Sequence, residues 1–345
     1  MYMYIYIIMT IIKNLDCTVR DGGYINNWRF NEKFINEYCN ILNITNIDYV
    51  EIGFINNTNN YKNKIVGEYR NLNEEIIKKF DKYNFKKVVM ADFIDINYQL
   101  LENKINIDLI RIAFHKKDLT KALESCKIIK DLGYNVSVNA MAITNYTNDE
   151  LNYLFEYINE HKLDMLYIAD SFGSLTQNDI KRYFDLFDSQ LNEDCTIGFH
   201  LHNNMNNAYG NYEFLKNYVN DFTRKIIVDT TMFGMGRGAG NLQTELVVKD
   251  SINLENIYKM VGFIQDFIKP IYKNNENTWS YDLDYLLSGY LKMHPNYIVK
   301  MRDLDISMKN RFFLIRQLEE RKYDYKYFDI EIMNNFIEEY KSQLL

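Results

Sequence analysis

The chain has 345 residues, of which 47% are hydrophobic and 15% aromatic, so it can bury a large core and is not intrinsically disordered. Its formal net charge of -7 argues against a nucleic-acid-binding surface, which relies on clustered lysine and arginine. The four cysteines, Cys17, Cys39, Cys126 and Cys195, are scattered without a paired spacing. This distribution fits neither a zinc ribbon nor a disulfide scaffold, and it indicates a reducing cytoplasm.

The opening stretch, residues 1–9, is apolar but shorter than the ~20 residues that a membrane span needs. It also lacks the basic start and the small-residue cleavage site of a secretory signal. We therefore expect an extension that leads into the first strand, and no membrane partner.

Apolar runs rich in Ile, Val and Tyr alternate with stretches of helical period, which is typical of repeated βα units around a parallel sheet. The predicted strands are residues 11–17, 48–54, 87–92, 108–114, 135–142, 165–170, 196–202 and 225–231, and predicted helices include 31–42, 119–132, 148–161 and 177–189. Eight strands close an α/β fold of the (β/α)₈ TIM-barrel type over ~250 residues. A doubly wound open sheet is the alternative, but the turn after the first strand lacks the Gly-x-Gly-x-x-Gly spacing of a nucleotide site.

The rest of the chain reads as further helices over residues 252–272, 281–301 and 306–345. We therefore predict a barrel domain at 1–250 and a helical C-terminal extension at 251–345, with 274–277 as the best linker candidate. Such an extension could cover the mouth of the barrel, pair with another chain, or only add solvated packing.

Polar residues stand at or just past the carboxyl ends of the predicted strands. They are Asp21, Glu51, Asp92, His115, Asn139, Asp170, His200, His202 and Asp229. In a barrel all these ends open on the face where catalytic residues sit. Residues two apart on a strand point the same way, so His200 and His202 share one side. With the Asp21 carboxylate they make a set that suits a divalent cation, although each feature could also be an unrelated polar group or a local ion pair.

A glycine-rich loop, residues 233–242 (FGMGRGAGNL), follows the eighth predicted strand. Its four glycines let backbone N–H groups approach a ligand closely, and the loop opens onto a helix, so it could hold an anion. It could equally be a flexible turn.

Residues 15–23 (LDCTVRDGG) resemble the signature of the DRE-TIM metallolyases, and residues 198–204 (GFHLHNN) resemble their metal motif. Within that superfamily the chain is most similar to the 4-hydroxy-2-oxovalerate aldolases, because residues 111–115, 170–173 and 234–241 match as well. The resemblance covers about the first 250 residues in consistent order. It implies an HMGL-like, divalent-metal-dependent aldolase that cleaves or forms a 4-hydroxy-2-oxo acid, giving pyruvate and an aldehyde.

The resemblance also implies roles for particular residues. Asp21, His200 and His202 would hold Mn²⁺ or Mg²⁺, and Arg20 would stabilise the enolate oxygen. Ser171, Asn241 and Arg111 would support the substrate. In the related hydroxymethylglutaryl-CoA lyases the residue equivalent to Asn241 is itself a metal ligand.

One position departs from the family pattern. The aldolases have a histidine, linked to deprotonation of the substrate alcohol, where this chain has Tyr24. A tyrosine with a pKa of ~10 is a poor base. His115, His294 or a hydroxide held by the metal could replace it. Residues 285–290 loosely resemble the family segment with a catalytic tyrosine, so Tyr285 or Tyr290 could fill that role.

Two other functions stay open. A Claisen condensation of acetyl-CoA with a 2-oxo acid, as in isopropylmalate synthase-like enzymes, belongs to the same superfamily, but the tail is short for their regulatory domain. A non-catalytic barrel subunit could have lost its base at Tyr24, although an intact ligand set argues against decay. The expected partners are a small 2-oxo acid and an aldehyde, with a homo-oligomer or a dehydrogenase partner as further options.

Overall fold

The computed structural model describes residues 12–57, 60–61, 64–273 and 279–343. The apolar opening at 1–9 and the linker candidate at 274–277 lie outside these ranges. No helix within them has the length and apolar composition that crossing a membrane requires.

Eight parallel strands close into a barrel in the order β1-β10-β9-β8-β7-β6-β5-β2. They are β1 (Ile12–Asp16), β2 (Tyr49–Phe54), β5 (Lys86–Asp92), β6 (Leu109–Phe114), β7 (Val136–Ala140), β8 (Met165–Asp170), β9 (Thr196–Leu201) and β10 (Ile226–Thr230). Every predicted strand is present, and the TIM-barrel prediction is confirmed. A small hairpin, β3 (Asn60–Tyr61) with β4 (Lys64–Ile65), is inserted after β2.

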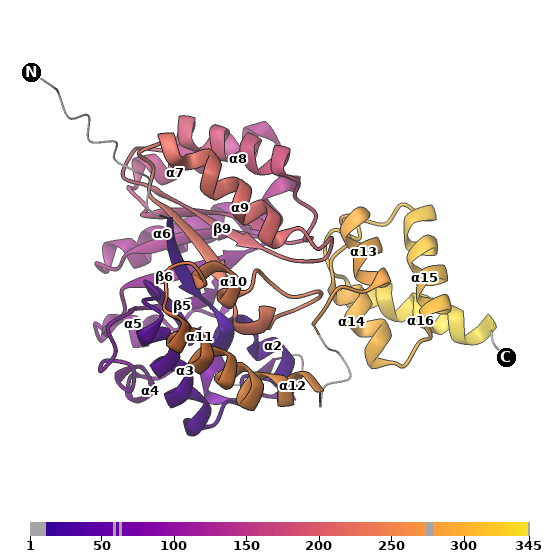
Figure 1. The fold of residues 1–345 in the computed structure, drawn as a ribbon. Helices are drawn as coiled ribbons and strands as arrows, with labels where there is room; N and C mark the ends of the chain where they lie inside the picture. The colour runs from indigo at the N-terminus through magenta and orange to yellow at the C-terminus, as the bar shows by residue number, and fades with distance from the viewer. Residues whose placement is uncertain (1–11, 58–59, 62–63, 274–278, 344–345) are drawn as a thin grey trace, which may run out of the picture.

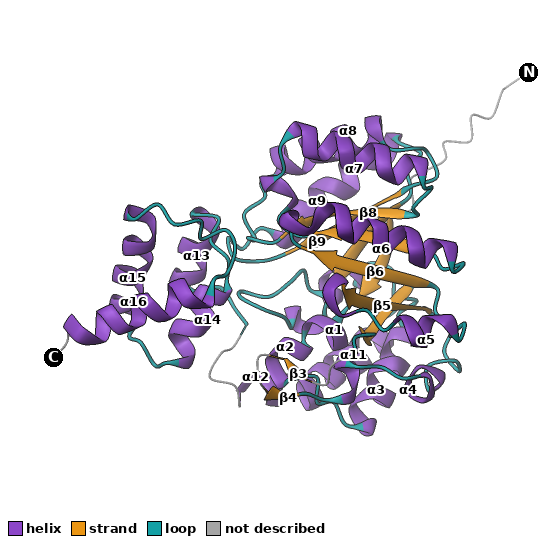
Figure 2. Ribbon diagram, turned by 180° about the vertical axis from the view of Figure 1, so that it is seen from behind, coloured by secondary structure: helices purple, strands orange, loops and turns teal. Residues whose placement is uncertain are grey.

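Helices cover the outside of the barrel (Figures 1 and 2). They are α3 (Glu32–Ile44), α4 (Glu74–Lys78), α5 (Tyr98–Glu102), α6 (Leu119–Asp131), α7 (Asn148–Glu160), α8 (Gln177–Gln190), α9 (Ala208–Tyr218) and α10 (Thr244–Val248). Two short helices, α1 (Thr18–Asp21) and α2 (Gly23–Asn26), follow β1, and α1 is buried at the carboxyl end of that strand. Thr147 and Thr176 begin α7 and α8 with capping boxes, in which each threonine and an acidic residue three positions on satisfy orphan N–H groups. The four helices predicted around the barrel correspond to α3, α6, α7 and α8, and each begins and ends close to its expected position.

An apolar cluster fills the inside of the barrel, where Leu15, Val88, Leu109 and Tyr167 meet. Gly198 on β9 makes room for the Tyr167 ring, because a Cβ atom there would lie 2.4 Å from a ring carbon. The barrel is thus a packed core with its polar groups at the carboxyl ends of the strands.

The chain after residue 250 falls into two parts. The first, α11 (Leu254–Phe263), a π-helical turn (Ile264–Ile268) and α12 (Lys269–Lys273), continues the barrel core, and Phe263 packs on Phe34 of α3 with ring centroids 5.4 Å apart. The second, α13 (Leu283–Tyr290), α14 (Asn296–Asp303), α15 (Met308–Glu320) and α16 (Ile330–Gln343), has a core of its own and lies to one side of the barrel (Figure 1). We expected a boundary at 250, and this packing leads us to propose one between Trp279 and α13 instead.

Helix α13 anchors the extension to the barrel mouth. The Nδ2 of Asn204, in the loop after β9, donates a hydrogen bond of 3.2 Å to the Ser288 hydroxyl. A Cβ atom on Gly289 would lie within 3.1–3.3 Å of Met205, Phe172 and Asn204, so a larger residue would need these neighbours to shift by a few tenths of an ångström. The extension therefore covers part of the mouth, as one of the expectations had it.

Candidate active site at the barrel mouth

A cavity of about 610 Å³ opens at the carboxyl ends of the strands. Its floor includes Arg20, Arg111, His200 and His202, and its outer part includes His115, Arg237, His294 and Tyr327. Four of the chain's five histidines thus line this one cavity, and only His161 lies elsewhere.

Asp21, His200 and His202 form a possible metal-binding group, with ligand atoms within 4.8 Å of one another. The Nδ1 atom of His202 lies 2.7 Å from the backbone oxygen of Asp170, and that of His200 lies 2.8 Å from a carboxylate oxygen of Asp229. A carbonyl oxygen only accepts, so Nδ1 of His202 carries the proton, and an ionised Asp229 favours the same tautomer in His200. Both rings then keep Nε2 as the free lone pair that a metal requires.

The charges of this group suit a cation. Burial, helped by the neighbouring His200, lowers the pKa of His202 to about 3, so its ring is neutral. Burial alone would raise the pKa of Asp21, but Arg20 and His200 outweigh it and hold that pKa well below its usual range. An ionised carboxylate beside a neutral imidazole is the form in which these side chains bind metal.

Asn241 brings a further oxygen close to this group. Its Nδ2 donates to Asp21 across 2.5 Å, while its buried Oδ1 has no hydrogen-bond partner among the described residues. The glycine-rich loop closes here through a bridge between His202 and Asn241, and a Cβ atom on Gly236 would lie 2.2 Å from the Asn241 amide nitrogen. An orphaned buried oxygen beside a carboxylate and two imidazoles fits a divalent cation.

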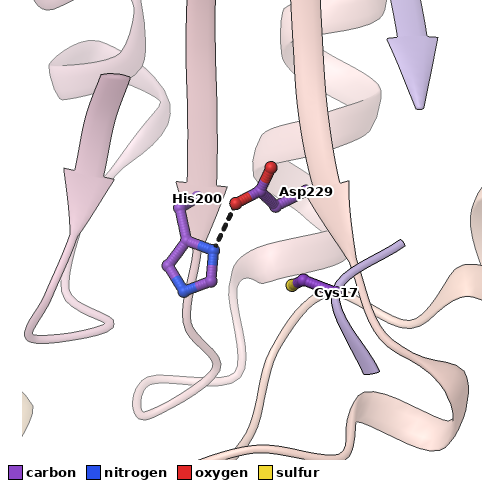
Figure 3. Close-up of side chains that lie close together, drawn as sticks. All are labelled: Cys17, His200 and Asp229. Carbon is purple, nitrogen blue, oxygen red and sulfur yellow. Dashed lines mark hydrogen bonds and ion pairs between the residues drawn. The ribbon is translucent and has the colours of Figure 1, made fainter. Parts of the chain in front are cut away.

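A second cluster, Cys17, His200 and Asp229, is drawn in Figure 3. Its chemistry does not suit a metal. Burial raises the pKa of the Cys17 thiol well above its usual value, so the thiolate ligand is missing. Arg111 and the Tyr167 hydroxyl already occupy the Asp229 carboxylate, at 2.6 and 2.8 Å. We interpret Asp229 as the group that orients His200.

A network of buried charges holds Arg20 in place under the cavity. Its Nε and Nη1 donate to Glu51 at 2.6 Å and to Asp21 at 2.7 Å, and Arg111 bridges Glu51 and Asp229 from the other side at 3.0 and 2.6 Å. The Arg111 guanidinium also lies 4.1 Å from the centroid of the Tyr167 ring. Buried ion pairs with this many partners fix geometry, because removing one member leaves an uncompensated charge.

The structure brings most of the other predicted residues to the cavity. Ser171 lines it, and its hydroxyl accepts a 2.8 Å hydrogen bond from the Ala142 N–H. Tyr24 and His294 line it as well. Burial raises the pKa of Tyr24, so this residue stays protonated and is not a base.

Tyr290 is the exception. Its side chain is 74% exposed and does not line the cavity, while Tyr285 is buried in the core of the extension. The prediction of Tyr290 as a catalytic residue therefore finds no support in its position, and we drop it.

Sequence reasoning missed Arg237 and Tyr327, which both line the outer cavity. Arg237 lies in the glycine-rich loop that the sequence did single out, so its side chain could have been considered. Tyr327 belongs to the helical extension and carries no motif.

The fold and its polar mouth define a TIM-barrel protein with a candidate metal centre at the carboxyl ends of the strands. The chain belongs to the HMGL-like family, whose model matches residues 11–252. It is 25% identical over 276 residues to the 4-hydroxy-2-oxovalerate aldolase of Carboxydothermus hydrogenoformans, covering 75% of this chain and 77% of that protein.

A second aldolase sequence and a solved structure are also similar to this chain. The 4-hydroxy-2-oxovalerate aldolase of Bacillus thuringiensis is 22% identical over 269 residues, which are 75% of this chain and 76% of that one. The structure is similar to the N-terminal domain of a proposed aldolase from Bacteroides vulgatus, with a TM-score of 0.75 and 26% identity over 88% of this chain and 99% of that domain. The resemblance to the DRE-TIM superfamily is thereby confirmed.

Proposed function

We propose that this protein is a divalent-metal-dependent aldolase, a carbon–carbon lyase that cleaves or forms a 4-hydroxy-2-oxo acid and gives pyruvate and an aldehyde. The observation that carries this proposal is the grouping of Asp21 with His200 and His202 beside Arg20, at a cavity that Arg20 and the two histidines line. The names of the relatives support the same reaction class.

Mn²⁺ or Mg²⁺ would be held by the Asp21 carboxylate and by the Nε2 atoms of His200 and His202, with the orphaned Asn241 oxygen as a further ligand. When bound, the cation supplies Lewis-acid polarisation of the 2-oxo group.

Arg20 is the group that stabilises the enolate. Its guanidinium is always charged and planar, so it donates directed hydrogen bonds to the oxygen on which negative charge develops. Glu51 and Asp21 fix its orientation. Arg111, which we expected to bind substrate, is 1% exposed and joins Glu51 to Asp229, so we propose that it mainly positions Arg20 and His200. Ser171 keeps its proposed place beside the substrate.

The base in this proposal is His115. Burial lowers its pKa, and the charges of Lys117 and Arg237 lower it further, so the imidazole is neutral and able to accept a proton near pH 7. It takes the proton of the C4 hydroxyl, the C3–C4 bond breaks, and the bonding electrons move to the enolate oxygen near Arg20. The aldehyde is then released, and protonation of the enolate at C3 gives pyruvate. His294, whose ring centroid lies 6.5 Å from that of His115, is the second candidate.

The test is release of pyruvate from 4-hydroxy-2-oxo acids in the presence of Mn²⁺, measured with coupled lactate dehydrogenase. The same preparation should release no free CoA from acetyl-CoA and a 2-oxo acid. CoA release without pyruvate release would replace the aldolase with a Claisen-condensing enzyme, and neither activity would favour a non-catalytic barrel.

A further inference from the structure

The cavity is larger than a small aldol requires. Its volume of about 610 Å³ lies in the ~300–1,000 Å³ range of pockets that enclose drug-sized ligands. One water occupies roughly 30 Å³ of liquid, so a five-carbon hydroxy-oxo acid held at the floor would leave much of this space unfilled. The remaining space lies in the outer part of the cavity.

Three segments far apart in the chain build that outer part. The loop after β6 supplies His115 and Lys117, the glycine-rich loop supplies Arg237, and the extension supplies His294 and Lys326. The His115 ring lies 5.8 Å from the Tyr327 ring and 6.5 Å from the His294 ring, centroid to centroid. The loop and the extension therefore face each other across a narrow space.

This outer part is positively charged, although the chain as a whole carries -7. Its cations are Arg237, Lys117 and Lys326, and its carboxylates are Asp92 and Asp118. Asp92 is paired with Arg70, which does not line the cavity. Cations thus outnumber carboxylates in this part of the cavity, and low-dielectric walls concentrate their field.

The two lysines of this set line the cavity and are not neutralised by a salt bridge with a described residue. Lys116 forms a 2.7 Å salt bridge with Glu150, whereas its neighbour Lys117 lines the cavity and forms no salt bridge with any described residue. The same holds for Lys326. The Arg237 guanidinium lies 4.1 Å from the centroid of the Tyr24 ring, which holds it over the mouth. Its charge lowers the pKa of both Asp21 and His115, so it acts on the candidate metal group as well as on the outer part of the cavity.

We propose that the aldehyde half of the substrate carries an anionic group, a carboxylate or a phosphate, which Arg237, Lys117 and Lys326 bind in the outer cavity. This inference rests on the proposed aldolase function. It makes the substrate a 4-hydroxy-2-oxo acid with a second negative charge at the end remote from the 2-oxo group.

Binding to the full-length, Mn²⁺-loaded protein tests the anion site without any need for turnover. Calorimetry would compare 2-oxosuberate with 2-oxooctanoate, which have the same length and differ in a terminal carboxylate or methyl group. We expect the dicarboxylate to bind roughly tenfold or more tightly, the effect of one charge-assisted hydrogen bond. Arg237→Gln, Lys117→Gln and Lys326→Gln should each reduce that preference, whereas Lys121→Gln and Lys322→Gln, from the same regions but outside the cavity, should keep it.

Kinetics then identify the anion. Addition of pyruvate to succinic semialdehyde is compared with butanal, and addition to glyceraldehyde 3-phosphate with glyceraldehyde. A higher kcat/KM for one charged member, lost in the three cavity variants, supports the inference and separates carboxylate from phosphate.

Equal binding of the two 2-oxo acids, or turnover of neutral aldehydes alone, overturns the anion site and leaves the aldolase standing. Preferential binding of 2-oxosuberate without turnover of any aldehyde supports the anion site and counts against the aldolase.

Discussion

The Nδ1 atom of His200 on β9 lies 2.8 Å from Oδ2 of Asp229 on the neighbouring strand β10 (Figure 3). Arg111 binds the same carboxylate oxygen at 2.6 Å and helps to keep it ionised, since it lowers a pKa that burial alone would raise. The hydrogen bond between His200 and Asp229 therefore keeps the proton on Nδ1 and leaves Nε2 free to bind a metal.

Asp229→Asn should weaken Mn²⁺ binding by roughly 10- to 100-fold, the usual cost of losing the partner that orients a ligating histidine. The measurement is a Mn²⁺ titration. Tyr167→Phe is the matched control, because it removes a different hydrogen bond to Asp229 and leaves His200 untouched. Equal losses in both variants would mean that Asp229 matters only for packing.

The second prediction concerns the metal itself. EDTA should abolish pyruvate release and Mn²⁺ should restore it. His200→Ala should lose the bound metal and the activity while its melting temperature stays close to that of the wild type, since a residue at the mouth contributes little to the core. His161→Ala, the histidine outside the cavity, should behave like the wild type in both measurements. A fully active metal-free enzyme would refute the metal centre.

The strands and half of the site could be predicted because both depend on local periodicity. Apolar runs marked each strand, and the two-residue repeat placed His200 and His202 on one side of β9. The role of Asp229 could not be read in this way. It depends on the pairing of β10 with β9, which brings a residue 29 positions away beside the His200 ring.

The residues of the extension that face the barrel were harder to predict, because a helix turns by ~100° per residue. In α13, Ser288 and Gly289 face the barrel, and the next residue, Tyr290, points to solvent. The similarity of a short segment cannot fix that rotation. The expected boundary at 250 assigned the predicted helix at 252–272 to the extension, whereas Phe263 of α11 packs on Phe34 of α3.

The third prediction is that Arg20→Lys lowers kcat by about 10²- to 10³-fold and changes KM much less. Lysine keeps the charge but misplaces the donors to the enolate oxygen. Because Arg20 also pairs with Asp21 and Glu51, Mn²⁺ affinity and melting temperature must be measured beside kcat. An activity that falls only in proportion to metal occupancy would make Arg20 a structural residue instead.

The fourth prediction separates the base from the rest of the site. His115→Asn should slow cleavage of a 4-hydroxy-2-oxo acid by roughly 10²- to 10⁴-fold, the typical contribution of a general base. Decarboxylation of oxaloacetate should survive, because it forms the same enolate without a hydroxyl proton to remove. Tyr24→Phe should retain substantial cleavage activity, since burial keeps the Tyr24 hydroxyl protonated in the wild type.

The pH profile gives an independent check of the same residue. Burial and the nearby charges of Lys117 and Arg237 lower the pKa of His115, so its neutral form persists to a lower pH than that of a free histidine. The acid limb of kcat/KM should therefore lie below the ordinary histidine value of ~6.5, with activity lost as the pH falls through it. Lys117→Gln removes one of those charges and should move the limb upward, whereas Lys121→Gln should not. An acid limb that stays in place in Lys117→Gln, together with cleavage and decarboxylation that fall equally in His115→Asn, would transfer the role of the base to His294.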